Sequence, residues 1–493
     1  MTKLSELNIR ELERKGNWRY NNPKISGIET SSFRVEKGHI FFAMPSKTKD
    51  NHGVLFSDQA LARGASLVIT DREGFQYALS KGFKLIGSFL IVENLEKALN
   101  VACESFYSNK PSFIMGVTGT NGKTSVVNLS QQLIEQNNEP CVTLGTLGVN
   151  GVLDLKTENT TPDQTYIHKV LNMAKLEKAE YAFLEVSSHS IVQKRIKGVP
   201  FNVFCFTNLS QDHLDYHKDM RTYFEAKLMI LDLLDLQTKI IVNIDDKYGK
   251  IFSVTAKNKG FEVETIGFSD TADLKLKAHS ETTGTQYIEI TRGIFSGSFR
   301  TNLIGAFQAV NLAMAILTCV TFGFKLKDIV AGCKFLQPVP GRMELVGKTR
   351  NGSLVFIDFA HTPEALKHLL KTLRAITKGK LILVFGAGGE RDKDKRKPMG
   401  AMALKYCDSI FVTDDNPRHE DSATIRRQVI SGCPSAIEIE DRALAITTAI
   451  GQSKGDDIVI IAGKGHEKVQ VIGDNYFPFS DFEQASIAIE IMG

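Results

Sequence analysis

A lysine and a threonine behind a glycine loop are the residues with the clearest chemistry in this sequence. In the segment TGTNGKTS, Lys123 and Thr124 follow Gly122, and Gly119 stands earlier in the loop. Glycines let backbone N–H groups approach phosphate oxygens, the lysine supplies charge, and the threonine hydroxyl can hold Mg²⁺. The general phosphate-loop pattern would place a glycine at Val117, so a chance glycine turn is the alternative to a phosphate cradle.

The residues on either side of this loop predict the elements that hold it. Phe113–Val117 is a short apolar run typical of a buried strand. After the loop, Val126, Leu129 and Leu133 recur at helical spacing. A strand, a glycine loop and a helix in this order favour phosphate binding, because the helix N-terminus adds positive potential.

Two residues further along the chain are candidates for a metal site. Glu185 stands near the end of the predicted strand Tyr181–Val186, where a carboxylate can bind Mg²⁺ or simply cap the strand. Lys227 stands among apolar residues of a predicted helix, where a charged amine is costly to bury. It either reaches the surface or has a pKa lowered by burial, and a neutral amine can add CO₂ to give a carbamate ligand for Mg²⁺. The run DHLDYH, residues 212–217, is a further polar site, and without cysteine it does not favour zinc.

The last third of the chain repeats a pattern of strand, polar loop and helix. The predicted strands are Leu354–Asp358, Leu381–Phe385, Ser409–Thr413 and Ile458–Ala462. In a parallel sheet the loops that follow them meet at one edge, where open α/β sheets bind ligands.

Two of these loops contain arginines with different surroundings. Arg391 stands where a dinucleotide-binding glycine pattern would need its third glycine, so we do not expect NAD. Arg418 follows Asp-Asn-Pro, and a guanidinium on a rigid turn suits a carboxylate. The charged run Asp392–Lys397 is expected to be a solvated surface.

The length of 493 residues predicts about three domains, and the mixture of predicted strands and helices predicts an α/β protein. These are a small N-terminal α/β domain (1–112), a central P-loop ATPase domain (113–337) and a C-terminal Rossmann-like domain (338–493). The net charge of +4 is too small to indicate a nucleic-acid partner, and seven scattered cysteines indicate reduced thiols. The sequence shows no signal-peptide core and no run of about 18 apolar residues, so we expect a cytoplasmic protein without membrane insertion.

Several motifs together resemble the Mur ligase family over essentially the whole chain. They are TGTNGKTS, NTTP, EVSSH, TNLSQDHLDYH, the AK of the Lys227 helix, GRMEL, DFAHTPEAL, GERD, DDNPR and AGKGHE. The last three are similar to the branch that adds the third amino acid of the peptidoglycan stem. The resemblance implies ATP-driven amide formation on UDP-N-acetylmuramoyl-L-alanyl-D-glutamate through an acyl phosphate, with Mg²⁺ as cofactor. It also implies that Arg418 selects meso-diaminopimelate as the amino acid.

The resemblance implies roles for individual residues. The catalytic residues are Lys123, Lys227 and His213. ATP is bound by Gly119, Thr120, Asn121, Gly122, Lys123, Thr124, Ser125, Asn311, Arg342 and Asp358. Mg²⁺ is bound by Thr124, Glu185, His213 and carbamylated Lys227. The UDP-muramoyl dipeptide is bound by Ser32, Thr160, Thr161, Ser187, Gln193 and Arg195. The amino acid is bound by Arg391, Asp415, Asn416, Arg418, Gly463 and Glu467.

The N-terminal segment departs from the family pattern, in which Asp-Ser-Arg precedes a strand. Here Ser31 and Phe33 replace the aspartate and the arginine around Ser32, and Arg34 comes one place later. The uridine contacts therefore stay open.

Three alternatives to this function also stay open. An L-lysine-adding Mur ligase differs only in the amino acid that it adds. Folylpolyglutamate synthetase shares the phosphate loop but lacks a uridine-binding N-terminal domain and the DDNPR loop. A regulatory P-loop NTPase would bind partners without forming a bond. In each ligase reading we expect small-molecule substrates, no nucleic acid and a monomer.

Overall fold

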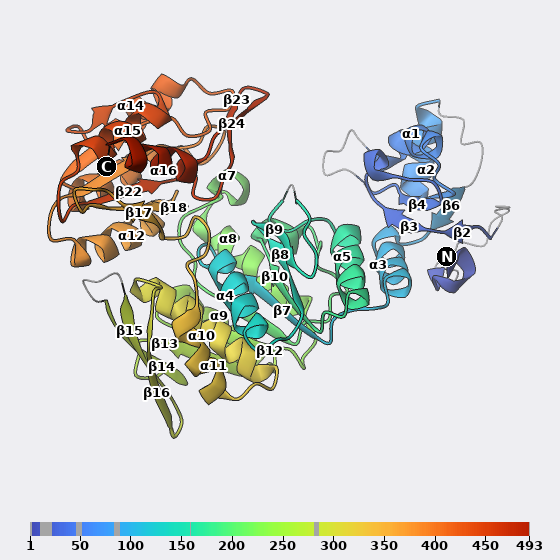
Figure 1. Ribbon diagram of the computed structural model, residues 1–493. Helices are drawn as coiled ribbons and strands as arrows, with labels where there is room; N and C mark the ends of the chain where they lie inside the picture. The colour runs from blue at the N-terminus through green and yellow to red at the C-terminus, as the bar shows by residue number, and fades with distance from the viewer. Residues whose placement is uncertain are drawn as a thin grey trace.

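The computed structural model describes residues 2–9, 22–45, 52–82, 89–157, 159–280 and 285–492. Within these ranges the chain is an α/β protein, as predicted, built around three main sheets that follow one another along the sequence. Figure 1 shows the central unit between the N-terminal unit on one side and the C-terminal unit on the other. The domain boundaries at residues 112 and 337 stay predictions.

The N-terminal unit is built on a parallel sheet of order β3-β4-β5-β6. Its strands are buried on both faces, since Ile40 and Phe42 pack in one core and Phe41 packs in another. The elements of this unit are β1 (Thr2–Lys3), β2 (Lys24–Ile25), β3 (Gly27–Glu29), β4 (His39–Phe42), α1 (Ser57–Ala62), β5 (Leu67–Asp71), α2 (Arg72–Ser80), β6 (Phe89–Val92) and α3 (Leu95–Phe106).

The central unit is built on a sheet of order β16-β15-β14-β13-β12-β11-β7-β10-β8-β9. It is parallel from β14 to β8, and β15, β16 and β9 run antiparallel to their neighbours. The strands are β7 (Phe113–Thr118), β8 (Cys141–Gly145), β9 (Gly148–Gly151), β10 (Tyr181–Glu185), β11 (Val203–Phe206), β12 (Lys239–Asn243), β13 (Val263–Gly267), β14 (Leu274–Ser280), β15 (Gln286–Arg292) and β16 (Phe295–Thr301). The helices are α4 (Lys123–Glu135), α5 (Gln164–Leu176), α6 (Ser188–Val192), α7 (Leu214–His217), α8 (Met220–Leu228), α9 (Lys247–Asn258), α10 (Ala306–Thr321) and α11 (Leu326–Gly332).

Strand β7 lies in the interior of this sheet, paired in parallel with β10 and β11. Met115 and Val117 pack into the core on the side of α4 and α10, which lie side by side in Figure 1, and Ile114 packs into the core on the side of α5. Burial on both faces requires the continuous apolar run that the sequence shows. Because the strands are parallel, the segments that follow β7, β10 and β11 meet at one edge.

The C-terminal unit is built on a sheet of order β17-β18-β22-β19-β20-β21, in which only the edge strand β17 is antiparallel among the described residues. The four strands predicted here are present as β18, β19, β20 and β22, so their loops do share one edge. The elements are β17 (Glu344–Lys348), β18 (Leu354–Asp358), α12 (Pro363–Ile376), β19 (Leu381–Phe385), α13 (Arg396–Tyr406), β20 (Ser409–Val412), α14 (Ser422–Ile430), β21 (Ile437–Glu438), α15 (Arg442–Gln452), β22 (Ile458–Ala462), β23 (Val469–Ile472), β24 (Asn475–Pro478) and α16 (Asp481–Met492).

Polar contacts join the three units. Arg34 of the N-terminal unit binds Asp163, which caps α5, and Gln164 donates to Asn100 at 2.9 Å. On the other side, Gln211 of the central unit donates to Asp392 Oδ2 of the C-terminal unit at 3.2 Å. In the described part of the chain, no helix has both the length and the apolar composition needed to cross a membrane.

Candidate functional site

The loop after β7 has the shape that phosphate binding requires. Gly119 and Gly122 have φ angles of 151° and 92°. A Cβ on Gly119 would lie 1.8 Å from the hydroxyl of Thr207, and one on Gly122 would lie 2.5 Å from the side-chain oxygen of Asn311. Only glycine fits at these two positions, because the positive φ angles and the neighbouring side chains both exclude a Cβ. Lys123 Nζ donates to the carbonyl oxygens of Gly119 at 3.0 Å and Thr120 at 2.8 Å, and burial lowers its pKa.

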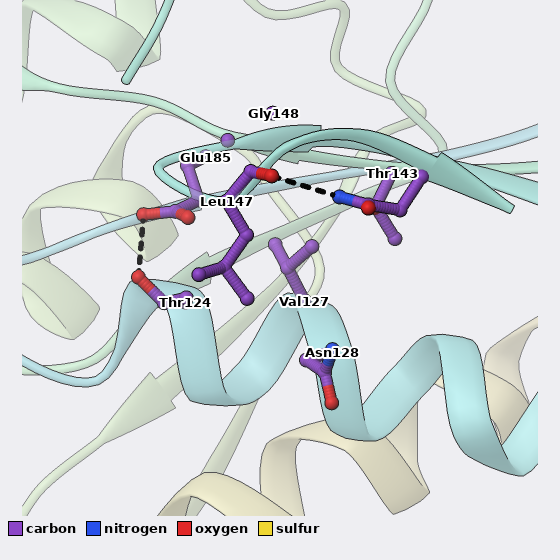
Figure 2. A pocket seen from close by; sticks show the side chains of 9 residues that line it. Thr124, Val127, Asn128, Thr143, Leu147, Gly148 and Glu185 are labelled. Atoms are coloured by element: carbon purple, nitrogen blue, oxygen red, sulfur yellow. Dashed lines mark hydrogen bonds between the residues drawn. The ribbon is translucent and has the colours of Figure 1, made fainter. Parts of the chain in front are cut away.

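The hydroxyl of Thr124 and the carboxylate of Glu185 converge beside this loop. Thr124 donates to Glu185 Oε2 at 3.0 Å (Figure 2), and Glu185 is 2% exposed. The backbone N–H of Thr146 at 2.8 Å and its hydroxyl at 3.0 Å hold the same carboxylate. Glu185 thus caps the neighbouring turn and also faces the small pocket between α4, β8 and β9, so both readings of this residue fit the geometry.

Lys227 is buried against the phosphate loop. Its side chain is 1% exposed, and Nζ donates to the oxygen of Gly119 at 3.0 Å and lies 4.8 Å from the centre of the Tyr223 ring. Burial, and then the charge of Lys123, lower the pKa of Lys227 well below its usual value. The lysine therefore does not reach the surface. The amine meets the physical condition for adding CO₂, and the carbamate itself stays a prediction.

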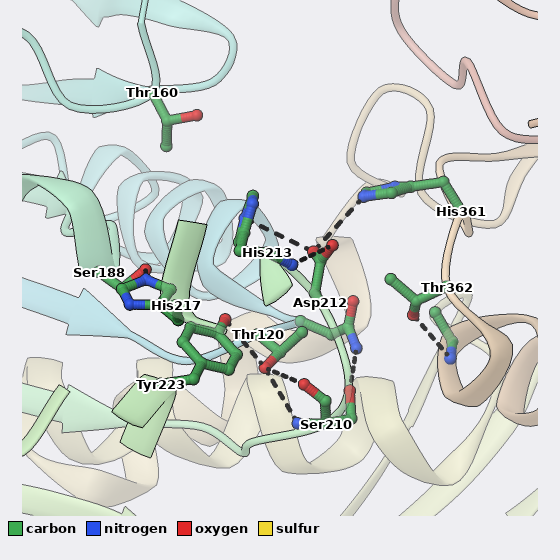
Figure 3. A network of polar contacts seen from close by, with 12 residues as sticks. Thr120, Thr160, Ser188, Ser210, Asp212, His213, His217, Tyr223, His361 and Thr362 are labelled. Atoms are coloured by element: carbon green, nitrogen blue, oxygen red, sulfur yellow. Dashed lines mark hydrogen bonds and ion pairs between the residues drawn. The ribbon is translucent and has the colours of Figure 1, made fainter. Parts of the chain in front are cut away.

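Asp212, next to His213, is contacted by residues of the C-terminal unit close to the phosphate loop. His213 Nε2 lies 3.5 Å from Asp212 Oδ2, which also faces His361 Nε2 at 3.7 Å (Figure 3). Lys395 Nζ lies 4.0 Å from Asp212 Oδ1. Burial lowers the pKa of His213 to about 3. Although burial acts to raise the pKa of Asp212, its hydrogen bond with His361 and the charge of Lys395 hold it below its usual range. The imidazole of His213 is thus neutral, the form that can bind a metal.

Asn311, Arg342 and Asp358 come from both units. Asn311 adjoins Gly122, as described above. Arg342 Nη2 donates to the hydroxyl of Thr124 at 3.3 Å, and its guanidinium lies 4.2 Å from the centre of the Phe359 ring. Asp358 accepts from the backbone N–H of Met343 at 2.7 Å, and burial raises its pKa.

Four of the residues expected to bind the uridine substrate form one cluster. The hydroxyl of Thr161 donates to the backbone oxygen of Glu185 at 2.7 Å and accepts from Ser187 N at 3.0 Å. Arg195 donates to the oxygen of Thr161 at 2.7 Å and to the side-chain oxygen of Gln193 at 2.7 Å.

Two other residues of that set lie outside this cluster. Thr160 lies beside it, with its hydroxyl 3.3 Å from that of Thr146. Ser32 belongs to the N-terminal unit, where it donates to Gln59 at 2.7 Å. Arg34 of the N-terminal unit instead contacts Asp163 of the central unit, and no local pattern in the sequence predicts this pairing.

Residues expected to bind the amino acid surround the carboxyl edge of the C-terminal sheet. Asn416 donates to Glu467 Oε2 at 2.9 Å, and the buried amine of Lys464 donates to both residues at 2.9 Å. Arg418 donates to the oxygen of Gly389 at 2.7 Å. Burial, and then the nearby charge of Arg391, lower the pKa of Arg418.

The remaining two residues of the amino-acid set adjoin each other, since a Cβ on Gly463 would lie 2.8 Å from Asp415 Oδ2. Lys464 is not among the residues predicted for this site, although its amine contacts Asn416 and Glu467.

One expectation for this edge is wrong for half of its residues. In the run Asp392–Lys397, Lys393, Asp394 and Lys397 are exposed as predicted. Asp392, Lys395 and Arg396, however, are only 8%, 4% and 0% exposed. Lys395 faces Asp212, and Arg396 binds Glu420. Carboxylates distant in sequence compensate the buried charges, so the composition of the run alone gives no sign of burial.

The donors in this site fit ATP and Mg²⁺ but do not form a preassembled metal cluster. The described residues contain no group of three or more His, Cys, Asp or Glu side chains that could hold a metal ion. The glycine cradle suits phosphate oxygens. Thr124 and Glu185 offer oxygen ligands, which Mg²⁺ prefers, and carbamylated Lys227 would add another.

Comparisons with known proteins agree with this geometry. Residues 117–319 match the family model described as the Mur ligase middle domain, and residues 341–465 match that of the Mur ligase glutamate ligase domain. A Rickettsia montanensis protein named UDP-N-acetylmuramoyl-L-alanyl-D-glutamate--2,6-diaminopimelate ligase is 36% identical over 482 residues, which are 96% of this chain and 97% of that protein.

Two solved structures extend the comparison. One bears the same ligase name, has a TM-score of 0.69 and 30% sequence identity, and the match covers 99% of both chains. Mycobacterium tuberculosis folylpolyglutamate synthase, solved with ADP and AMPPCP, has a TM-score of 0.60 and 18% identity, and the match covers 74% of this chain and 91% of that one. The second similarity concerns the fold alone.

The lowered pKa of Lys227 predicts a pH-dependent difference between the unmodified protein and Lys227→Met. Lys227 has a lowered pKa in the folded state, so at pH values below its pKa in the unfolded chain it must release a proton on folding. The free-energy cost of this deprotonation decreases as pH rises. Methionine does not titrate and carries no such cost. In CO₂-free urea unfolding, the stability difference in favour of Lys227→Met should shrink by up to about 1.4 kcal/mol per pH unit as pH approaches about 10.4. Lys257→Met, at an exposed position of α9, is the matched control, and parallel curves for the Lys227 pair would contradict the assignment.

Proposed function

The chain belongs to the Mur ligase family, and on that basis we propose that it joins meso-diaminopimelate to UDP-N-acetylmuramoyl-L-alanyl-D-glutamate in an ATP-dependent reaction. The main observation behind the proposal is that the phosphate loop of the central unit contacts the C-terminal unit, whose sheet edge carries arginines. Arg342 of the C-terminal unit contacts Thr124 of the phosphate loop, and the same unit presents Arg391 and Arg418. A ligase needs a nucleotide site and an amine site that open onto each other.

Different residues of the site bind the ATP phosphates and Mg²⁺ in the proposed reaction. Lys123 and the backbone N–H groups of the loop hold the phosphates of ATP. The γ-phosphoryl group passes to the D-glutamyl carboxylate, which gives an acyl phosphate and releases ADP. The amine of diaminopimelate then attacks the carbonyl carbon and loses a proton, an amide forms, and phosphate leaves. Thr124, Glu185, His213 and carbamylated Lys227 would hold Mg²⁺, which would neutralise phosphate charge. Most of the catalysis comes from positioning and from preorganised charge.

Carbamylation of Lys227 is part of this proposal. An uncharged amine beside Lys123 adds nothing to metal binding while it donates to Gly119. A carbamate would turn the same side chain into an anionic oxygen ligand. The cluster of Thr161, Ser187, Gln193 and Arg195 holds the uridine substrate, with Thr160 beside it and Ser32 on the N-terminal unit. A cytoplasmic location and a monomeric state stay predictions from the sequence.

The arrangement of the amino-acid edge favours diaminopimelate over L-lysine. The two differ by one carboxylate, and Arg418 offers a two-bond fork on a turn stiffened by Pro417. Lysine would leave that guanidinium without an anion in a half-buried place. Folylpolyglutamate synthetase is the second candidate, because its fold is shared and its reaction also forms an amide by use of ATP.

Release of phosphate tests the function directly. We expect phosphate release from ATP only when the UDP-muramoyl dipeptide and meso-diaminopimelate are both present, because the acyl phosphate needs one and its breakdown needs the other. Mass spectrometry should find the dipeptide plus diaminopimelate minus water. Turnover of folates would favour folylpolyglutamate synthetase, and hydrolysis independent of both substrates would favour a regulatory NTPase.

Loss of Lys227 tests the carbamate. Lys227→Ala should fold but lose roughly a hundredfold or more of its activity, the scale on which single charge-stabilising groups act. Acetate or formate should restore part of the activity by taking the place of the carbamate. Lys257→Ala serves as the control for loss of a lysine. Full activity of Lys227→Ala would refute this role.

Replacement of Arg418 tests the choice of amino acid. A charge-assisted pair contributes enough for at least about tenfold discrimination. Arg418→Ala should therefore reduce kcat/KM for diaminopimelate by that factor or more and change residual lysine use far less. Arg427→Ala, at an exposed position of α14, is the control. Equal kcat/KM for lysine and diaminopimelate in the unmodified protein would rule out this reading.

A further inference from the structure

Arg396 is a fully buried arginine that the proposed reaction does not use. It begins α13, and its guanidinium is shared by three partners. Nη1 donates to Gln428 at 2.7 Å and to Glu420 Oε2 at 3.0 Å, while Nη2 donates to Glu420 Oε1 at 3.2 Å and to the backbone oxygen of Gly388 at 3.0 Å. This is a two-bond fork on one carboxylate, with two further bonds that fix its plane.

The partners of Arg396 belong to the two loops that carry the arginines of the amino-acid edge. Gly388 precedes Arg391 in the loop after β19, and Glu420 follows Arg418 in the loop after β20. Arg396 therefore links these two loops through hydrogen bonds in the protein interior, where it is not exposed to solvent.

Other contacts hold the same loops at close range. The N–H of Gly389 donates to the oxygen of Asn416 at 2.9 Å, and a Cβ on Gly389 would lie 1.9 Å from the oxygen of Pro417. The N–H of Glu390 donates to Glu420 at 2.5 Å. The carboxylate of Glu420 thus accepts from both the loop and Arg396.

The helices behind the loops fix the place where Arg396 and Gln428 meet. Helices α13 and α14 approach closely at Gly400, where a Cβ would lie 2.2 Å from the backbone oxygen of Val429. A larger residue there would push the helices apart. The bridge is therefore built on rigid elements and not on the loops alone.

A bridge is needed because the two loops present like charges to each other. The charge of Arg391 is one of the causes that lower the pKa of Arg418, after burial. Without a bound anion the two guanidinium groups repel, and their loops tend to separate. The two hydrogen bonds between Arg396 and Glu420 oppose this separation of the loops. Chiefly through its hydrogen bond with Arg396, the pKa of Glu420 is lowered to about 2, so its carboxylate is ionised at neutral pH.

We propose that Arg396 is a positioning residue that sets substrate specificity, because it holds the loops of Arg391 and Arg418 so that both guanidinium groups converge on the second carboxylate of the amino acid. The identity of that anion rests on the proposed function. The bridge itself rests only on the hydrogen bonds of Arg396.

Steady-state kinetics of Arg396→Met, Arg396→Lys and Glu420→Gln test this role. For Arg396→Met and Glu420→Gln, KM for meso-diaminopimelate should rise by at least about tenfold, because a charge-assisted fork is lost. KM for ATP and for the UDP-muramoyl dipeptide should stay unchanged, and the preference for diaminopimelate over lysine should fall. Arg396→Lys keeps the charge and should recover part of the preference. Arg427→Met, on the exposed side of α14, is the matched control.

A double variant separates the bridge from general stability. If the two residues act as one unit, Arg396→Met combined with Glu420→Gln should raise KM no further than either change alone. A lower melting temperature with unchanged KM and unchanged preference would make Arg396 merely structural and overturn the proposal. Should Arg396→Met fail to fold, Glu420→Gln decides the question, since it keeps the shape of the side chain. An unmodified protein that does not ligate diaminopimelate would instead defeat the proposed function, and this inference with it.

Discussion

The carbonyl oxygen of Gly119 accepts hydrogen bonds from two lysine amines, and the electrostatics of the whole site depend on this shared acceptor. Lys123 Nζ and Lys227 Nζ each lie 3.0 Å from it. Burial favours the neutral form of each amine, and the charge of Lys123 lowers the pKa of Lys227 further. Two ammonium groups cannot remain there at low cost unless an anion joins them. A phosphate beside Lys123 and a carbamate on Lys227 are two ways of supplying that anion, so nucleotide binding and lysine modification relieve the same strain.

The position of this pair follows from the order of the strands. Strand β7 lies between β10 and β11, so the segments after these three strands bring the glycine loop, Glu185 and residues 207–213 to one edge. The C-terminal unit then faces that edge through Arg342, His361 and Lys395. The described contacts thus place Arg342, His361 and Lys395 of the C-terminal unit against Asp212 and the phosphate loop of the central unit. Buried pairs of this kind are screened by salt much less than pairs at the surface.

The sequence predicts those strands, loops and helices whose pattern lies within a short segment of the chain. The apolar run before Gly119 and the helical spacing after Lys123 predict β7 and α4, and the four strand-and-loop units of the C-terminal sheet are equally local. The segments LKLKAHS and QYIEITR alternate apolar and polar residues and become β14 and β15, an antiparallel extension that the domain-level prediction leaves out. Burial of charge is different. Nothing near Arg396 in sequence distinguishes it from a solvated arginine, because Glu420 and Gln428 reach it only through the tertiary fold. The site of Lys227 was predicted through family resemblance, since apolar neighbours alone also suit a lysine that extends to the surface.

The crowding around Gly119 explains how the loop can depart from the general phosphate-loop pattern at Val117. That valine is a buried residue of β7, where a side chain fills the core and nothing requires glycine. The demand for glycine falls instead at position 119, where the hydroxyl of Thr207 occupies the space of a Cβ and donates to the oxygen of Asn121 at 2.6 Å. The spacing of the glycines thus depends on where another segment of the same chain approaches the loop. A search that fixes both glycines in advance would pass over this loop, whereas one that asks where the backbone is crowded would find it.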